Sequence, residues 1–507
     1  MTLRVLVPVA ALSVLGPSAA WGAAPPQDTI VVGIHEDMLT LDPMDFRHRE
    51  TETILRNIYD GFVTRNPQME IVNELAESVR PVSDTVWEIR LRPGVTFHDG
   101  SPFTAQDAVF SINRHVQEGA MGGRTSPRKG LFSPITGAEV VDTYTLRVHM
   151  SQPWPIFLRM LPHMLVVSRA VGDQMVTRPV GTGPFRFVSW ERGTQVVLER
   201  YDGYYGGAPE LPPVGPARAR RVIFRVIPED STRVAALLAG EVDLITRLPV
   251  DAIPTIERDP NLEVLRVNGT RSYFLEMNVN RPPFDDVRVR RAMNHALDVQ
   301  AVIDTVLGGL AVRIPTILSP QSFGYDPALK PYPYDPERAR QLLREAGYPN
   351  GFDLELDTLP YRRAVAEAYA LMLNEVGIRT RVRLWNDWAA LRDQILAGRR
   401  QAWLQDWGSS ILDPADIATP KLRTRDRGNF TGYSNPEVDR LIDLMNNSVD
   451  PEVRRRAAYQ MQWIVYDDAP MVFEYVAQEL YAKNRRLQGW EPIPDSRINL
   501  HDAYKTR

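Results

Sequence analysis

LRPGVTFHDGSPFTAQDAVFSINR, residues 91–114, joins the end of a strand, a tight turn and the start of a helix. Residues 85–92 alternate apolar and charged side chains, which predicts a half-buried strand leading into this stretch. Pro93-Gly94 ends that strand, because this dipeptide favours a turn. Thr104 with Asp107 three residues later is a capping-box pattern, so a helix is predicted to begin at residue 105. The stretch therefore indicates an α/β domain.

Composition indicates an ordinary globular protein with more than one sub-domain. The chain has 507 residues, 24% of them charged, and a net charge of −4, so it lacks the basic surface expected of a nucleic-acid-binding protein. It contains no cysteine, which excludes disulfides, thiolate catalysis and cysteine-bound metals. No cysteine is available for a lipid anchor either. No nucleic-acid partner is expected from this composition.

The N-terminus carries the signals of an export sequence. A basic residue, Arg4, precedes an apolar run over residues 5–15, which is shorter than the ~20 residues of a membrane span. Small residues then cluster around Ala20 and Gly22, where cleavage is expected. Residues 1–22 are therefore predicted to be a signal peptide, and the mature protein is expected in the bacterial periplasm without a lipid anchor.

The second half of the sequence alternates strands and helices. Helix starts are expected after Asp335, Asn435 and Asp450, since each is followed by Pro-Glu and can cap the helix with its side chain. Extended segments at 352–356 and 378–384 flank a helical segment at 364–376. This order predicts βαβ units and a mostly parallel sheet. The first half is richer in strands.

Several short phrases occur in an order that resembles one protein family. Besides residues 91–114 they are LDP (41–43), NIYDG (57–61), GTGPF (181–185), GEVD (240–243), PFDDVRVRRA (283–292), LLREAGY (342–348) and NFTGYSNPEVDR (429–440). Each phrase alone is weak, but their shared order resembles the extracellular solute-binding proteins of the peptide and nickel class, family 5, which serve ABC importers. The resemblance spans nearly the whole mature chain.

The resemblance implies a two-lobe periplasmic binding protein fold with a hinge and a sub-domain inserted in the first lobe. The first lobe would comprise residues 28–60, 180–270 and 485–507, the inserted sub-domain 61–179, and the second lobe 271–484. Such folds close around a ligand by a hinge motion. The implied function is delivery of a small solute to the permease subunits of an ABC importer, by a monomer that needs no cofactor.

Residues 403–414, WLQDWGSSILDP, contain the main ligand-binding candidates. Peptide-binding relatives have a Trp followed by an aspartate that pairs with the α-ammonium of the peptide, ahead of an Asp-Pro. Trp407 and Asp413 match this spacing, but Ser410 occupies the position of that aspartate, and a hydroxyl cannot neutralise an ammonium. Either Asp406 or Asp413 substitutes, or the protein does not prefer a free amine. Asp413 could alternatively begin a helix.

Further candidates follow from side-chain chemistry and from the resemblance. Trp407 and Trp403 offer apolar surfaces with one donor each, although core packing explains Trp403 equally well. Arg362 and Arg363 open a helix where relatives place an arginine that holds a carboxylate, yet arginines at a helix start are usually solvated. Two first-lobe candidates are placed by resemblance only, namely Asp42 and the segment 45–47 that contains Phe46.

The sequence leaves open which ligand is bound and whether the protein is an enzyme. The resemblance makes a peptide or peptide-like solute the default, while opines, oligosaccharides, glutathione-like conjugates and metal chelates are alternatives on the same fold. No HExxH metal motif and no GxSxG nucleophile elbow occurs in the sequence, and paired carboxylates alone do not define a hydrolase. A periplasmic hydrolase is thus the weaker alternative, and no catalytic residue is expected.

Overall fold

The structure is a computed structural model that describes residues 26–385 and 388–506; the expected signal peptide, residues 1–22, lies outside them. Residues 91–114 fold as their pattern predicts. Strand β5 spans Val86–Leu91 and helix α2 spans Ala105–Val116. The Asp107 carboxylate accepts hydrogen bonds from Thr104 N at 3.1 Å and from Thr104 Oγ1 at 3.0 Å, so the capping pair is formed.

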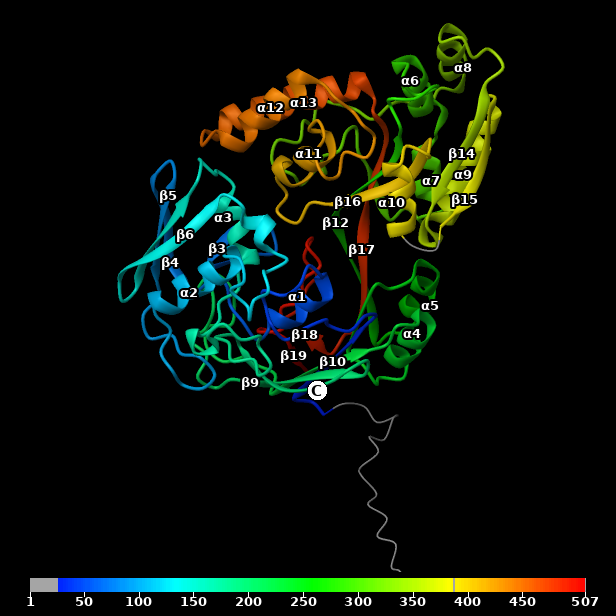
Figure 1. Cartoon of the computed structure of the whole chain (residues 1–507). Coiled ribbons are helices and arrows are strands. Elements are labelled where there is room, and N and C mark those ends of the chain that lie inside the picture. Colours follow the sequence, from blue (N-terminus) through cyan, green and yellow to red (C-terminus); the bar gives the residue numbers. More distant parts are fainter. Residues whose placement is uncertain (1–25, 386–387, 507) are drawn as a thin grey trace, which may run out of the picture.

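Two long strands connect the two halves of the molecule. Strands β12 (Leu262–Met277) and β17 (Met471–Asn484) pair side by side and run between the halves, as Figure 1 shows. Their register shifts between Asn268 and Ser272, where the ladder is interrupted by a bulge. All strands of both halves that pair with them form one 11-stranded sheet. We call the lower half of Figure 1 without its cyan part the first lobe, and the upper half the second lobe.

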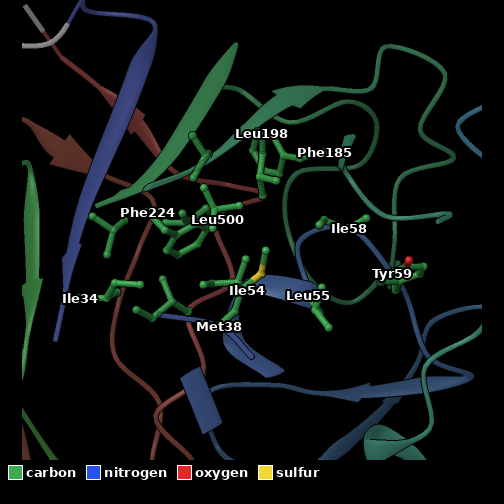
Figure 2. Packing of buried hydrophobic residues seen from close by; sticks show 14 of the residues in the cluster. Ile34, Met38, Ile54, Leu55, Ile58, Tyr59, Phe185, Leu198, Phe224 and Leu500 are labelled. Atoms are coloured by element: carbon green, nitrogen blue, oxygen red, sulfur yellow. The ribbon is translucent and has the colours of Figure 1, made fainter. Parts of the chain in front are cut away.

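The first lobe is built on parallel pairing around β1. Strand β1 pairs in parallel with β10 and β11, and β10 and β9 continue the sheet in antiparallel fashion. Its elements are β1 (Thr29–Ile34), α1 (Arg49–Leu55), β8 (Phe185–Glu191), β9 (Gln195–Arg200), β10 (Arg221–Val226), α4 (Asp230–Leu238), β11 (Leu244–Thr246), α5 (Ile253–Arg258), β18 (Leu487–Gln488) and β19 (Tyr504–Lys505). Leu500, near the C-terminal end of the chain, packs in the same core cluster as Ile54 of α1 and Phe224 of β10 (Figure 2), so the chain returns to the first lobe.

The inserted sub-domain, drawn mostly in cyan in Figure 1, has a separate four-stranded sheet in the order β4-β5-β7-β6. Helix α2 covers this sheet with its apolar stripe, in which Ala105, Ala108 and Ile112 are buried. The elements of this part are β2 (Val63–Arg65), β3 (Ile71–Asn73), β4 (Ala76–Ser83), β5, β6 (Ile135–Asp142), β7 (Thr145–Met150), α2 and α3 (Phe157–Met160).

The second lobe carries most of the helices. Its elements are α6 (Val287–Ala296), α7 (Val299–Thr305), β13 (Ala311–Arg313), α8 (Pro336–Glu345), β14 (Phe352–Thr358), α9 (Arg363–Glu375), β15 (Ile378–Leu384), α10 (Trp388–Leu396), β16 (Ala402–Gly408), α11 (Pro414–Leu422), α12 (Pro436–Asn447) and α13 (Pro451–Asp468). The side chains of Asp335, Asn435 and Asp450 cap α8, α12 and α13 as their pattern predicts.

The sheet of the second lobe is mixed, whereas the sequence pattern predicted a mostly parallel one. Strand β14 pairs in parallel with both β15 and β16, which is the predicted βαβ arrangement. The long strands β12 and β17 are antiparallel to each other, and β16 is antiparallel to β12. The chain leaves the first lobe along β12 and returns along β17, so neighbouring crossings must run in opposite directions.

No helix within the described part of the chain is both long and apolar enough to cross a membrane.

Candidate functional site

A cavity of about 310 Å³ lies where the two lobes and the inserted sub-domain meet. Side chains near α1 and near the C-terminus form one wall, and the segment between β16 and α11 forms the opposite wall. Its charged lining residues are Arg47, Arg49, Glu52, Arg128, Asp416, Arg427, Asp495 and Arg497. Five arginines thus face three acids, so the cavity favours an anionic or partly anionic ligand.

The second-lobe wall combines an aromatic surface with one carboxylate. The Trp407 ring is half-buried, and its Nε1 donates to the Asp416 carbonyl at 2.9 Å, which fixes the ring. The Asp416 carboxylate, in the first turn of α11, accepts from Ser410 N at 2.8 Å and from Ser410 Oγ at 3.3 Å. Burial raises the pKa of Asp416, while the hydrogen bonds from Ser410 favour its ionised form. Asp416 is the acid of this wall that could hold an ammonium.

Ser410 also reaches across the cleft to the inserted sub-domain. Its Oγ lies 3.2 Å from Nε2 of His163. The neighbouring Ile411 is buried in the apolar core of the inserted sub-domain, and Arg159 of that sub-domain lies 3.7 Å from the Asp413 carboxylate. The segment that follows β16 is therefore the part of the second lobe that contacts the opposite side most closely.

A network of paired charges forms much of the opposite wall of the cavity. The Glu52 carboxylate accepts from Arg497 at 2.7 Å and lies 3.2 Å from His163 Nδ1, while Arg497 also pairs with Asp495 at 3.1 Å. Burial opposes ionisation of Glu52, but the charge of Arg497 holds its pKa well below the usual range. Burial lowers the pKa of His163 to about 3 despite Glu52, so its imidazole is neutral. This network fixes the shape of the wall.

Arg47 and Arg427 form no ion pair among residues 26–385 and 388–506. Arg49 also lacks an ion pair there, but its guanidinium donates to the Asp495 carbonyl at 2.9 Å and to Ser496 Oγ at 2.8 Å. Arg427, from the second lobe, lies over the Trp407 ring at 5.0 Å. Arg47 projects from the segment before α1, and burial together with the charge of Arg427 lowers its pKa. The two guanidiniums therefore approach the same space from opposite lobes.

The structure places both alternative aspartates outside the cavity lining. Asp413 is fully buried, caps α11 by accepting from Ala415 N at 3.1 Å, and accepts from Arg454 at 2.7 Å. Asp406 pairs with Arg271 and accepts from Tyr361 Oη at 2.7 Å. Burial opposes ionisation of Asp406, but Arg271 nevertheless lowers its pKa. Both carboxylates already have a guanidinium partner.

Trp403 and Arg362 are interior groups. Trp403 is fully buried, and its Nε1 donates to Glu276 at 3.1 Å. Arg362 is buried in the second lobe, where its guanidinium pairs with Glu474 and lies 5.0 Å from the Tyr273 ring. Neither side chain lines the cavity.

The remaining candidates also lie away from the cavity lining. Arg363 is exposed on α9 and pairs with Glu367 at 2.7 Å. Asp42 is buried, pairs with Arg114, and accepts from Val176 N at 3.0 Å. Phe46 is buried under Arg128, whose guanidinium lies 4.6 Å from the ring.

Among the predicted candidates, Trp407 and Ser410 line the cavity. Asp416 and Arg427 were missed by the sequence reasoning. Asp416 follows the capping Asp413 by three residues, where an acid is already explained by the helix start. Arg427 belongs to a run of exposed arginines that resembles any solvated surface. Arg47 adjoins the candidate Phe46 in the segment 45–47.

Two larger hollows lack this convergence of charges. One of about 450 Å³ lies within the first lobe and includes Asp243, which pairs with Lys505 at 3.2 Å. The other, of about 520 Å³, opens elsewhere along the interlobe boundary near Phe323. Its arginine, Arg159, lies beside Phe323 and Asp413.

One group of side chains in the described residues has the donors for a metal ion. Atoms of His35, Glu36 and Glu50 lie within 4.8 Å of one another. Arg247 lies 3.4 Å from the same Glu50 carboxylate, so a positive charge already occupies its surroundings. The imidazole–carboxylate contacts are sufficient to explain the cluster as an ion-pair network.

A family model described as bacterial extracellular solute-binding proteins, family 5 middle, matches residues 70–429. The glutathione-binding protein GsiB of Pectobacterium atrosepticum is 28% identical, over 99% of this chain and 98% of the relative. GsiB of Escherichia coli K12 is 27% identical over 94% of each chain.

Solved structures give the same result for the fold. The periplasmic binding protein DppA of Helicobacter pylori, in complex with the peptide STSA, superposes with a TM-score of 0.79 at 26% identity, covering 94% of this chain and 98% of DppA. HbpA2 of Haemophilus parasuis gives a TM-score of 0.85 at 23% identity, covering 94% and 100%. The expected family resemblance and the two-lobe α/β fold are confirmed.

Proposed function

The chain belongs to family 5 of the bacterial extracellular solute-binding proteins, and from this premise we propose that it binds a small peptide-like solute in the interlobe cavity and delivers it to the permease of an ABC importer. The observation that carries the proposal is the cavity itself, because its walls come from both lobes and the inserted sub-domain. Its volume of about 310 Å³ is near the lower end of small-molecule sites, about 300–1,000 Å³.

The lining fits a zwitterionic solute. Asp416 provides a carboxylate for an ammonium, Arg47 and Arg427 provide guanidiniums for carboxylates, and Trp407 covers apolar atoms between them. A short peptide or glutathione carries these three features, in keeping with the glutathione- and peptide-binding relatives. In this proposal Ser410 positions Asp416, and Asp416 accepts the free amine of the ligand.

The division into lobes and the setting form part of the proposal. Residues 28–60, 180–270 and 485–507 form one rigid unit, 61–179 the insert and 271–484 the other unit, joined by β12 and β17. Family 5 proteins are periplasmic, and we place the processed protein there as a monomer without a lipid anchor.

A thermal-shift panel tests the function. Glutathione, Met-Leu and a nickel–histidine complex are added at equal concentration to the purified mature protein, and a true ligand should raise Tm, more so the tighter it binds. The same ligand should lower the radius of gyration in solution scattering and be recovered intact after incubation. Conversion of the ligand at a rate proportional to protein would support a hydrolase instead. No Tm response to any member, with no solute released from denatured protein, would contradict the proposal.

A further inference from the structure

Two unpaired guanidiniums face the same cavity from opposite lobes. Arg47 lies on the first-lobe side, just before α1, and Arg427 lies on the second-lobe side over the Trp407 ring. The other acids near them already have cationic partners, since Asp45 pairs with Arg124 at 2.9 Å and Glu52 with Arg497 at 2.7 Å. Asp416 is the remaining acid of this lining, and the charge of Arg427 acts on it, but neither guanidinium forms an ion pair with it in the described chain. The protein therefore supplies two guanidiniums here without a directly paired carboxylate.

We infer that Arg47 and Arg427 bind an acidic group of the solute between them, so that the transported solute is a carboxylate-bearing anion and this group joins the two lobes. The inference rests on the proposed function, since it names the class of ligand for the same cavity. A guanidinium presents a planar fork of donors that matches the two oxygens of a carboxylate. One carboxylate offers about four acceptor positions, which is enough for two arginines.

The same pair couples ligand charge to lobe closure. Closing the cleft without an anion brings two positive charges together and removes them partly from water, and both changes are unfavourable. A carboxylate between them reverses the sign of the interaction. A neutral or cationic solute of the same size would leave the repulsion in place, so the cavity selects by charge as well as by shape.

Titration calorimetry with glutathione tests the inference. Arg47→Gln and Arg427→Gln should each weaken glutathione binding about ten- to a hundred-fold, because each removes one partner of a charge pair. Glutathione diethyl ester, which lacks both carboxylates, should bind wild type poorly and be little affected by either substitution. Arg440→Gln, at an exposed arginine of α12 paired with Glu437, removes the same charge and should change affinity less than about twofold.

Scattering of the ligand-free proteins provides a second measurement, in which both variants should be at least as compact as wild type because the repulsion is weakened. The inference is overturned when glutathione binds both variants as tightly as wild type, a result that leaves the proposed function standing. It is also overturned when the solute released from purified wild type carries no carboxylate or other acidic group. Complete failure of wild type to bind or retain any solute contradicts the proposed function instead.

Discussion

The interior of the second lobe and the wall of the cavity use charged side chains in opposite ways. Inside the lobe, Arg362 pairs with Glu474 and Lys421 pairs with Glu276, and all four side chains are almost completely buried. At the cavity, Arg47 and Arg427 project without any such partner in the described chain. Charges that serve the fold are neutralised within the protein, whereas charges that serve binding await a counter-charge from outside.

The presence or absence of a partner carboxylate distinguishes arginines that look alike in the sequence. Arg362 and Arg427 have the same side-chain chemistry, but only Arg427 is available to a ligand. The physical criterion is whether the folded chain already provides a partner, because an unpaired buried charge is costly and a paired one is inert toward a ligand.

The largest effect is expected from breaking an interior pair. Arg362→Met should destabilise the protein by about 3–5 kcal/mol, because Glu474 then stays buried without a cationic partner. The urea midpoint of the second lobe measures this loss. Arg363→Met, at the exposed neighbouring residue that begins α9, should leave the midpoint unchanged. Equal midpoints for both variants would show that the interior pair is not needed for stability.

Asp416 provides the next largest effect, on binding instead of stability. Asp416→Asn preserves shape but removes the charge, so a ligand with a free α-ammonium should bind about ten- to a hundred-fold more weakly in titration calorimetry. An N-acetylated form of the same ligand has no ammonium and should lose little further affinity on substitution. Equal losses for both ligands would assign Asp416 a purely structural role in orienting Ser410.

The pH dependence of stability tests the neutral histidine in the cavity wall. The pKa of His163 is lowered to about 3 by burial, against about 6.5 in the unfolded chain, so the folded form binds fewer protons between these values. Stability should therefore fall as pH drops through this window, by at most about 2 kcal/mol between pH 6.5 and 5.

His163→Asn should flatten the dependence of Tm on pH over that interval. The matched control is His149→Asn, at an exposed histidine of β7, which should keep the wild-type slope. Other buried histidines, such as His98 and His115, add to the wild-type slope, so the difference between variants is the informative quantity. Identical slopes in all three proteins would contradict the assignment.

The smallest effect is expected at the contact between Ser410 and His163. Ser410→Ala removes a hydrogen bond across the cleft and one to Asp416, worth about 0.5–1.5 kcal/mol each. Ligand affinity should fall by only a few-fold, with a slightly larger radius of gyration in the bound form. A loss as large as that of Asp416→Asn would mean that the hydroxyl contacts the ligand directly.

Local elements were predictable because their signals lie within a few residues of one another. Helix α2 begins at residue 105 as the Thr104–Asp107 pattern predicts, and α12 buries Val438, Leu441, Ile442 and Met445 as its spacing predicts. The antiparallel crossing strands were not predictable from the alternation of strands and helices, which reports local order only.

The cavity was predictable only in part. Trp407 and Ser410 were found because the family phrase places them together. The partners that occupy Arg362 and Asp413 lie 112 and 41 residues away, at Glu474 and Arg454, and no local pattern announces such pairs. For the same reason, only the folded structure shows that Arg47 and Arg427 lack an ion-pair partner in the described chain.

The paired crossing strands β12 and β17 also determine how many ways the molecule can open. Two hydrogen-bonded strands side by side resist twisting past each other, and the register of their ladder shifts on both sides of Ser272, between Asn268 and Phe274. A methyl group at Gly269 would meet the Ala477 carbonyl oxygen at 2.9 Å, so the backbones must stay in close approach there. Two adjacent crossings of this kind favour a hinge rotation of the lobes over other relative motions. A solute that closes such a hinge restricts mainly that rotation, and little of its binding energy is spent on ordering the protein.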